Sequence, residues 1–212
     1  MNWKKKLLNE FELYGITDLK NEDPEIVSKI TEAFRGGMDV IQLRSKNLPD
    51  RFLLEIGKKI RQITLRMKKL FIVNDRLDLM LALDADGIHL GQDDLPVQIA
   101  RAMIKDKSKL IGYSTHSLKQ ARMAIKEGAD YIGFGPIFET PTKPNYQVTG
   151  LDLIKKIVKT AKIPVVCIGG IDQSNAKSVV KAGANRIAVV RAIFSSPHPF
   201  HAARELKRMI SQ

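Results

Sequence analysis

Short apolar runs alternate along the chain with longer segments whose apolar residues recur at helical spacing, and the alternation repeats eight times. Short β-rich runs are typical of buried parallel strands, and the wider spacing is typical of the helices that cover them. The predicted strands cover residues 12–16, 38–43, 70–73, 87–90, 110–112, 131–134, 165–168 and 186–190. The predicted helices cover residues 24–35, 49–67, 77–83, 96–105, 118–127, 151–160, 175–182 and 199–210.

Eight strand–helix pairs without a break in composition predict a single α/β domain, a (β/α)₈ TIM barrel over residues 1–212. Residues 1–10 form a basic N-terminal extension of this domain. A doubly wound open sheet is the alternative architecture. The phrases Gly128-Ala129-Asp130 and Gly183-Ala184-Asn185 each separate a helix from the next strand, so we expect them to be turns at the amino end of the barrel.

Polar clusters follow six of the apolar runs. In a (β/α)₈ barrel these positions are the carboxyl ends of the strands, where the active site lies. Basic, acidic, amide and glycine-rich clusters together predict a pocket for an anionic substrate with a metal. The clusters cover residues 42–46, 74–76, 89–94, 112–116, 135–136 with 140–143, and 169–170.

Gln42, Arg44 and Lys46 alternate along one strand end and therefore point the same way. Three polar side chains facing the barrel would be poorly placed in an apolar core, whereas they would suit a polar pocket. An arginine fork and a lysine point charge together match a diphosphate. A solvated strand end is the alternative, which fits Lys46 better than Gln42 and Arg44.

Asp75 and Asp94 are the candidate metal ligands, because two carboxylates at neighbouring strand ends can hold Mg²⁺ together with waters and substrate phosphates. Each aspartate could instead cap the helix that follows it. The joint pattern favours the metal, with Asp93 as the fallback ligand.

Two further segments are candidate phosphate sites. Thr140-Pro141-Thr142-Lys143 combines two hydroxyls with an ammonium, although an ordinary proline turn is the alternative. Gly169-Gly170 and Val190-Arg191 follow strands seven and eight, where barrels frequently bind phosphate, although paired glycines can also form a simple tight turn.

Composition narrows the functional class. The formal net charge of +12 would suit nucleic acid, but the lysines are dispersed over predicted helices, so we expect phosphorylated small molecules instead. No apolar run approaches the roughly 20 residues of a membrane span. Cys167 is the single cysteine, expected as a buried thiol in a cytoplasmic protein. His89 is expected to be a hydrogen-bonded structural residue, and neither a zinc cluster nor a nucleophile elbow is present in the sequence.

This set of motifs resembles the thiamine-phosphate synthase family, from Leu13-Tyr14-Gly15-Ile16-Thr17-Asp18 to Val189-Val190-Arg191-Ala192-Ile193. The most specific pieces are residues 42–46, 74–76 and 89–94, and Gly135-Pro136 with residues 140–143. The resemblance implies joining of hydroxymethylpyrimidine diphosphate to thiazole phosphate with release of diphosphate. It implies a dissociative displacement, in which Mg²⁺ and cationic side chains stabilise the departing diphosphate.

The resemblance also implies roles for individual residues. Gln42, Arg44, Lys46, Asn74, Ser114 and Lys143 would face the pyrimidine diphosphate, and residues 140–142, Gly170, Val190 and Arg191 the thiazole phosphate. The expected substrate-binding set is Gln42, Leu43, Arg44, Ser45, Lys46, Asn74, Ser114, Thr140, Pro141, Thr142, Lys143, Gly170, Val190 and Arg191. The expected catalytic residues are Arg44, Lys46, Ser114 and Lys143, and the expected metal ligands are Asp75 and Asp94.

Arg191 departs from the family pattern, because many members have serine there. A related thiazole tautomerase, which uses a histidine near His116, and a non-catalytic protein that binds thiamine intermediates are the alternative functions. We expect the protein to bind neither nucleic acid nor membrane, and a homo-oligomer is possible. Replacing Asp75 or Lys143 by alanine is expected to cripple turnover.

Overall fold

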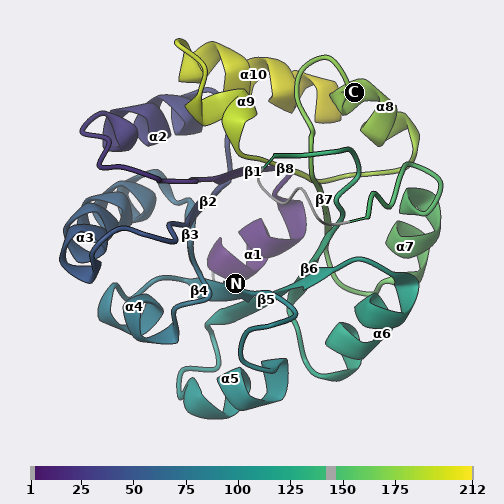
Figure 1. Cartoon of the computed structure of the whole chain (residues 1–212), viewed down its shortest axis with the longest axis horizontal. Coiled ribbons are helices and arrows are strands. Elements are labelled where there is room, and N and C mark those ends of the chain that lie inside the picture. The colour runs from purple at the N-terminus through teal and green to yellow at the C-terminus, as the bar shows by residue number, and fades with distance from the viewer. Residues whose placement is uncertain (1–2, 142–146, 212) are drawn as a thin grey trace.

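The computed structural model describes residues 3–141 and 147–211. Eight parallel strands form a closed barrel in sequence order, which confirms the predicted TIM-barrel fold (Figure 1). The barrel closes where Leu13 of the first strand pairs with Ile187 of the last. The strands are β1 (Leu13–Ile16), β2 (Val40–Leu43), β3 (Leu70–Asn74), β4 (Gly87–Leu90), β5 (Leu110–Thr115), β6 (Tyr131–Phe134), β7 (Val165–Ile168) and β8 (Ile187–Val189).

Helices surround the barrel as an outer layer (Figure 1). All eight predicted helices form, with ends that differ by up to three residues from the expected ones. The helices are α1 (Trp3–Glu10), α2 (Ile26–Arg35), α3 (Asp50–Met67), α4 (Leu77–Ala82), α5 (Val97–Met103), α6 (Leu118–Lys126), α7 (Ile154–Thr160), α8 (Ala176–Lys181), α9 (Arg191–Phe194) and α10 (Pro199–Ile210). Throughout the described residues, every helix falls short of the length and apolar character that a bilayer-spanning segment requires.

Alternation along the strands divides the buried side chains into two layers. On β2, Val40 packs in the cluster inside the barrel, while Ile41 and Leu43 pack in the larger cluster between strands and helices. The inner cluster is aromatic at its centre, where the rings of Tyr14 and Tyr131 lie 6.1 Å apart. Residues that continue the inward register past the inner cluster therefore emerge at the carboxyl end of the barrel.

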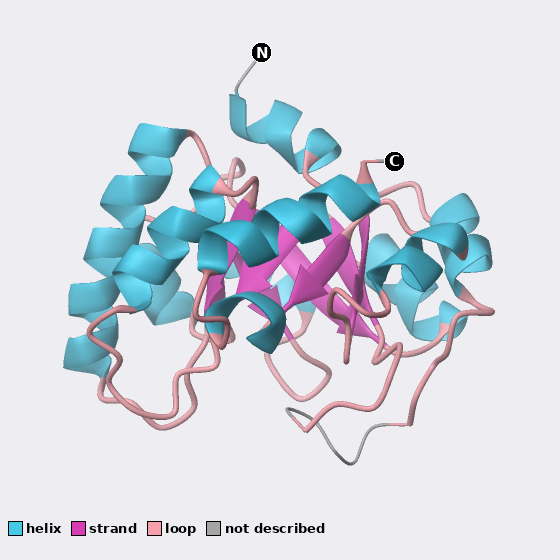
Figure 2. Ribbon diagram, turned by 90° about the horizontal axis from the view of Figure 1, so that it is seen from above, coloured by secondary structure: helices cyan, strands magenta, loops and turns pink. Residues whose placement is uncertain are grey.

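The amino end of the barrel is closed by α1, which the strand–helix pattern did not predict. Figures 1 and 2 show this helix lying across that end. Leu8 packs into the inner cluster, and the Lys4 ammonium lies 2.7 Å from the fully buried carboxylate of Asp86. The N-terminal segment predicted as an extension is thus a helix that packs against the amino end of the barrel and covers it.

The two glycine phrases are turns at this amino end, as expected. Gly128 and Gly183 follow helices with φ of 95° and 108°, which only glycine adopts readily. The largest difference at a helix boundary is at α7, which begins at Ile154 rather than at residue 151, because the Ile154 N–H donates to Leu151 O in a turn before the helix. Strand β5 continues to Thr115 and so carries Ser114 into the site.

Candidate active site

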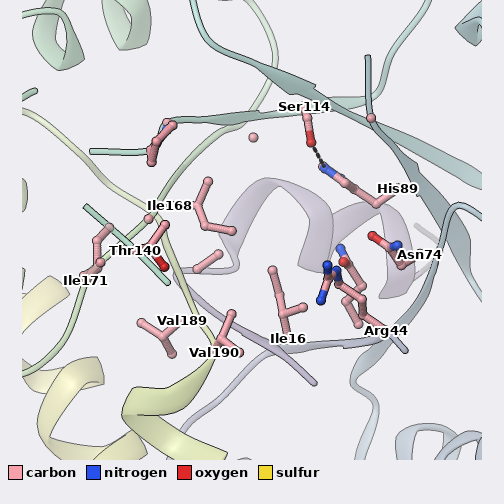
Figure 3. A pocket seen from close by; sticks show the side chains of 18 of the residues that line it. Ile16, Arg44, Asn74, His89, Ser114, Thr140, Ile168, Ile171, Val189 and Val190 are labelled. Atoms are coloured by element: carbon pink, nitrogen blue, oxygen red, sulfur yellow. Dashed lines mark hydrogen bonds between the residues drawn. The ribbon is translucent and has the colours of Figure 1, made fainter. Parts of the chain in front are cut away.

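A cavity of about 780 Å³ opens at the carboxyl end of the barrel. All six predicted polar clusters contribute to its wall, which bears out the convergence expected from their spacing. Figure 3 shows polar side chains on one side and mostly apolar side chains opposite them. Of the predicted site residues, those that line the cavity are Gln42, Arg44, Lys46, Asn74, Asp75, Asp94, Ser114, Thr140, Gly170, Val190 and Arg191.

The end of β2 supplies the basic part of the wall. Gln42 is buried, and its Nε2 donates to the Tyr14 hydroxyl at 2.8 Å. Arg44 is also buried and makes an ion pair with Asp18, while Lys46 is exposed at the rim. The alternation that predicted an inward-facing trio is therefore correct.

The intervening residues point elsewhere. Leu43 packs in the layer between strands and helices, and the Ser45 hydroxyl donates to Leu19 O at 2.9 Å. Pro141 is exposed and, like these two, does not line the cavity. The expected substrate contacts of Leu43, Ser45 and Pro141 thus have no side-chain basis in the cavity wall, because strand alternation turns the first two away.

Asp75 presents a carboxylate to the cavity from a left-handed backbone conformation, with φ of 57°. The capping alternative does not apply: α4 starts after Arg76 and α5 after Pro96, and neither start has a side-chain cap. Asp94 instead accepts the Gly91 N–H at 2.6 Å. Burial and the facing Asp94 carboxyl raise the pKa of Asp75 to about 7, against the opposing effects of Arg44 and Asn74.

Two facing carboxyl groups fit a divalent cation, which would offset their repulsion. Among the described residues, no group of three or more His, Cys, Asp or Glu side chains gathers as a metal cage. A cation held by two carboxylates must complete its shell with water and substrate oxygens, and Mg²⁺ is bound in this way. The residues present therefore fit Mg²⁺, with Asp93 exposed at the same rim.

Ser114 projects from β5 into the cavity, and its hydroxyl lies 3.0 Å from His89 Nε2, the contact drawn in Figure 3. His89 Nδ1 lies 3.2 Å from the hydroxyl of Tyr131, which confirms His89 as a hydrogen-bonded residue. His116 also lines the cavity, with Nδ1 bonded to Gly135 O.

The opposite wall comes from the ends of β6, β7 and β8. Gly169 and Gly170 have φ of 105° and 63°, and a Cβ at Gly170 would come within 2.5 Å of Glu139 O, so the turn requires glycine. Arg191 is exposed and begins the short helix α9 beside Val190. Thr142 and Lys143 lie outside the described residues.

Three supporting residues were given no role from the sequence, although Gln92 lies within the predicted cluster of residues 89–94. Asp18 pairs with Arg44, Gln92 Nε2 donates to Ser114 O at 2.5 Å, and Tyr131 supports His89 from the barrel core. Asp18 follows the first strand as the other clusters follow theirs, so its position was a usable signal. The tyrosine looked like an ordinary core residue.

Comparisons with known proteins agree with this geometry. The family model described as thiamine monophosphate synthase matches residues 13–193. The thiamine-phosphate synthase of Pyrococcus furiosus is 44% identical over 206 residues, covering 97% of this chain and 98% of that protein. That of Pyrococcus horikoshii is 44% identical over 212 residues, covering 100% and 99%.

A solved structure, thiamine phosphate pyrophosphorylase from Pyrococcus furiosus, superimposes with a TM-score of 0.87 at 43% identity. The alignment covers 97% of this chain and 98% of that one. The matches run through every strand that contributes to the cavity. The chain therefore belongs to the thiamine monophosphate synthase family and is a transferase.

Proposed function

We propose that this protein is a thiamine-phosphate synthase that joins 4-amino-2-methyl-5-hydroxymethylpyrimidine diphosphate to 4-methyl-5-(2-phosphoethyl)thiazole, with release of diphosphate. The observation that carries the proposal is the two-sided cavity. Its polar side gathers Arg44, Asn74 and the carboxylates of Asp75 and Asp94, and its other side presents Gly170 and Arg191. Two phosphorylated substrates can therefore meet across one cavity.

The polar side would hold the diphosphate. Arg44 offers a fork that Asp18 holds in place, and the exposed Lys46 adds a positive charge at the rim. Asp75 and Asp94 would hold Mg²⁺, which would stabilise negative charge on the leaving diphosphate. Lys143, predicted from the sequence to act with them, would add a further cation.

The other side would hold the thiazole phosphate. Thr140, Gly170 and the first turn of α9 at Val190 and Arg191 offer a hydroxyl, backbone N–H groups and a guanidinium. Ile168, Ile171 and Val189 supply the apolar surface beside them (Figure 3), on which the substrate rings can pack. Thr142 is expected to join this group.

The arrangement around Ser114 supports a displacement without a covalent enzyme intermediate. His89 contacts the Ser114 hydroxyl, but its other nitrogen meets the neutral phenol of Tyr131 rather than a carboxylate. A serine nucleophile of the Ser-His-Asp type needs that carboxylate to stabilise the imidazolium. Groups that stabilise a leaving diphosphate dominate the cavity, so loss of diphosphate before capture by the thiazole nitrogen is the mechanism we propose.

The test is incubation of the purified protein with both substrates and Mg²⁺, with diphosphate release as the readout. Release that requires the thiazole phosphate and stops with a chelator is expected. Isomerisation of a thiazole without diphosphate release would instead favour a tautomerase, for which His116 is the candidate residue. Tight binding of thiamine phosphate without turnover would favour a non-catalytic binding protein.

A further inference from the structure

A continuous chain of polar side chains crosses the barrel interior beneath the cavity. It starts at Gln42 on β2, whose Nε2 lies 2.8 Å from the Tyr14 hydroxyl. Tyr14 and Tyr131 bring their hydroxyls within 3.0 Å of each other, and Tyr131 reaches His89 Nδ1 at 3.2 Å. His89 Nε2 ends the chain at Ser114, 3.0 Å away. Residues on five strands thus connect two positions of the cavity wall.

The two tyrosines in the middle of this chain are neutral hydrogen-bonding groups. Each is 2% exposed, and burial raises the pKa of both phenols well above the ordinary value. A buried hydroxyl left without an acceptor costs free energy, so each phenol proton must be donated to a neighbour. This requirement gives the chain a direction.

The direction follows from the Gln42 amide, because an N–H₂ group can only donate. Tyr14 accepts this hydrogen bond, and among the described residues the other hydrogen-bond partner of its hydroxyl is Tyr131. Tyr14 therefore donates to Tyr131, and Tyr131 must donate its own proton to His89 Nδ1. His89 then carries its proton on Nε2 and donates to Ser114.

The outcome at the two ends is complementary. Ser114 Oγ accepts from His89, so its own proton is directed to the cavity as a donor. Gln42 uses its N–H₂ toward Tyr14, so its carbonyl oxygen remains as an acceptor at the cavity wall. A head-to-tail chain therefore gives one wall of the site a donor and an acceptor with set identities.

Two glycines leave the space that this arrangement needs. A Cβ at Gly112 of β5 would overlap the ring of Tyr131 and come within 2.5 Å of His89 Nδ1. A Cβ at Gly133 of β6 would come within 3.4 Å of the His89 ring. Gly112 pairs with His89 on one side and with Tyr131 on the other, so the His89–Tyr131 contact needs a residue without a side chain at that position of β5. This observation is independent of the hydrogen-bond directions.

We propose that Tyr131 and His89 are positioning residues. Tyr131 sets the tautomer of His89, and His89 in turn makes Ser114 a hydrogen-bond donor to the pyrimidine substrate. The role in substrate binding rests on the proposed function, whereas the tautomer is a property of the protein alone. Tyr14 acts at the other end of the chain, where it orients the Gln42 amide.

The test compares Tyr131→Phe with Tyr14→Phe, two substitutions that each remove one buried hydroxyl and keep the ring. Long-range ¹H–¹⁵N spectra of the imidazoles report the tautomer without substrate, and the protein has four histidines to assign. Wild type is expected to have the His89 proton on Nε2. Tyr14→Phe should keep it there, because Tyr131 can still donate, whereas Tyr131→Phe should shift the population toward Nδ1.

Kinetics provide the second readout. Tyr131→Phe should raise KM for the pyrimidine diphosphate about three- to tenfold, the value of one hydrogen bond, with a smaller effect on kcat. His89→Gln, which can still donate to Ser114, should bind the substrate better than His89→Leu. An Nδ1 proton in wild type, or identical spectra for both tyrosine variants, would overturn the proposal. If the tautomer shifts as expected but wild type releases no diphosphate, the proposed function is wrong, while the direction of the hydrogen bonds from Gln42 to Ser114 is still supported.

Discussion

Both ends of the barrel carry buried or half-buried aspartates, but the groups that surround these aspartates have opposite effects on the carboxylates. At the amino end, Asp39 accepts from Lys69 at 3.2 Å and Lys207 at 2.6 Å. It also accepts the backbone N–H groups of Glu12 and Leu13. At the carboxyl end, Asp75 faces another carboxyl group, that of Asp94.

The pKa values of the two aspartates move in opposite directions as a result. Burial would raise the pKa of Asp39, but Lys207, the Glu12 N–H and Lys69 outweigh it and lower the pKa below the ordinary value. Burial and Asp94 raise the pKa of Asp75 to about 7. The same residue type thus stabilises the fold at one end, whereas at the other its ionisation is opposed by burial and a facing carboxyl group, a repulsion that a bound cation or proton would relieve.

The largest effect that we expect from changing either aspartate is on the rate of turnover. Asp75→Asn should lower the rate of diphosphate release by about 100-fold or more, because the carboxylate proposed to hold Mg²⁺ beside the departing diphosphate loses its charge. The free energy of unfolding in metal-free buffer should stay level or rise, since the facing carboxylates no longer repel. Steady-state assays and urea titrations measure the two quantities.

The matched control for that substitution is Asp78→Asn. Asp78 is exposed on α4 and pairs with Arg76 away from the cavity, so its rate should match wild type. A near-normal rate in Asp75→Asn, or equal losses in both variants, would contradict the metal-ligand assignment.

At the amino end, Asp39→Asn should lower the free energy of unfolding by about 3 kcal/mol, because Lys207 and Lys69 both lose a largely buried carboxylate partner. kcat should change less than twofold. The difference from wild type should be full above pH 4 and shrink below it. A carboxyl with a lowered folded-state pKa stabilises the fold above its unfolded pKa of 3.8 and loses that effect as pH falls. Urea titrations at pH 7 and pH 3 measure this, and a gap that widens in acid would contradict it.

The sequence predicted the architecture and much of the cavity wall because both depend on local periodicity. Strand alternation placed Gln42 and Arg44 inside the barrel, and the same rule, applied strictly, would have excluded Leu43 and Ser45. The family resemblance assigned every residue of a motif to substrate binding, whereas the structure shows which side chains of each motif face the cavity and which face away from it.

Features that depend on long-range partners could not be predicted in this way. Tyr131 reads as an apolar strand residue, and only the folded barrel shows that it reaches His89 and Tyr14. Helix α9 spans four residues, too few for a helical pattern of apolar positions to be recognised. The sequence of α1 resembles a charged terminal extension, and only the folded structure shows that Lys4 pairs with Asp86.

A smaller effect tests the closure of the amino end by α1. Leu8 is 9% exposed and packs in the inner cluster, so Leu8→Ala should lower the free energy of unfolding by about 2 kcal/mol, the lower range for a buried leucine. The melting temperature should fall by about 4–8 °C with kcat unchanged. Leu81→Ala, at a leucine that is 52% exposed, should have little effect. Equal melting temperatures for the two variants would show that α1 does not cover the amino end of the barrel.

The smallest expected effect concerns Cys167 on β7, next to the cavity residue Ile168. Cys167 is fully buried in the layer between strands and helices, and burial raises the pKa of its thiol to about 12. At pH 8 only about one thiol in ten thousand would be ionised. An aromatic disulfide reagent should therefore leave the native enzyme unmodified and active, and should react fully in urea. Rapid modification that substrate prevents would place Cys167 in the cavity and turn Ile168 outward, reversing the side-chain register on which the apolar wall depends.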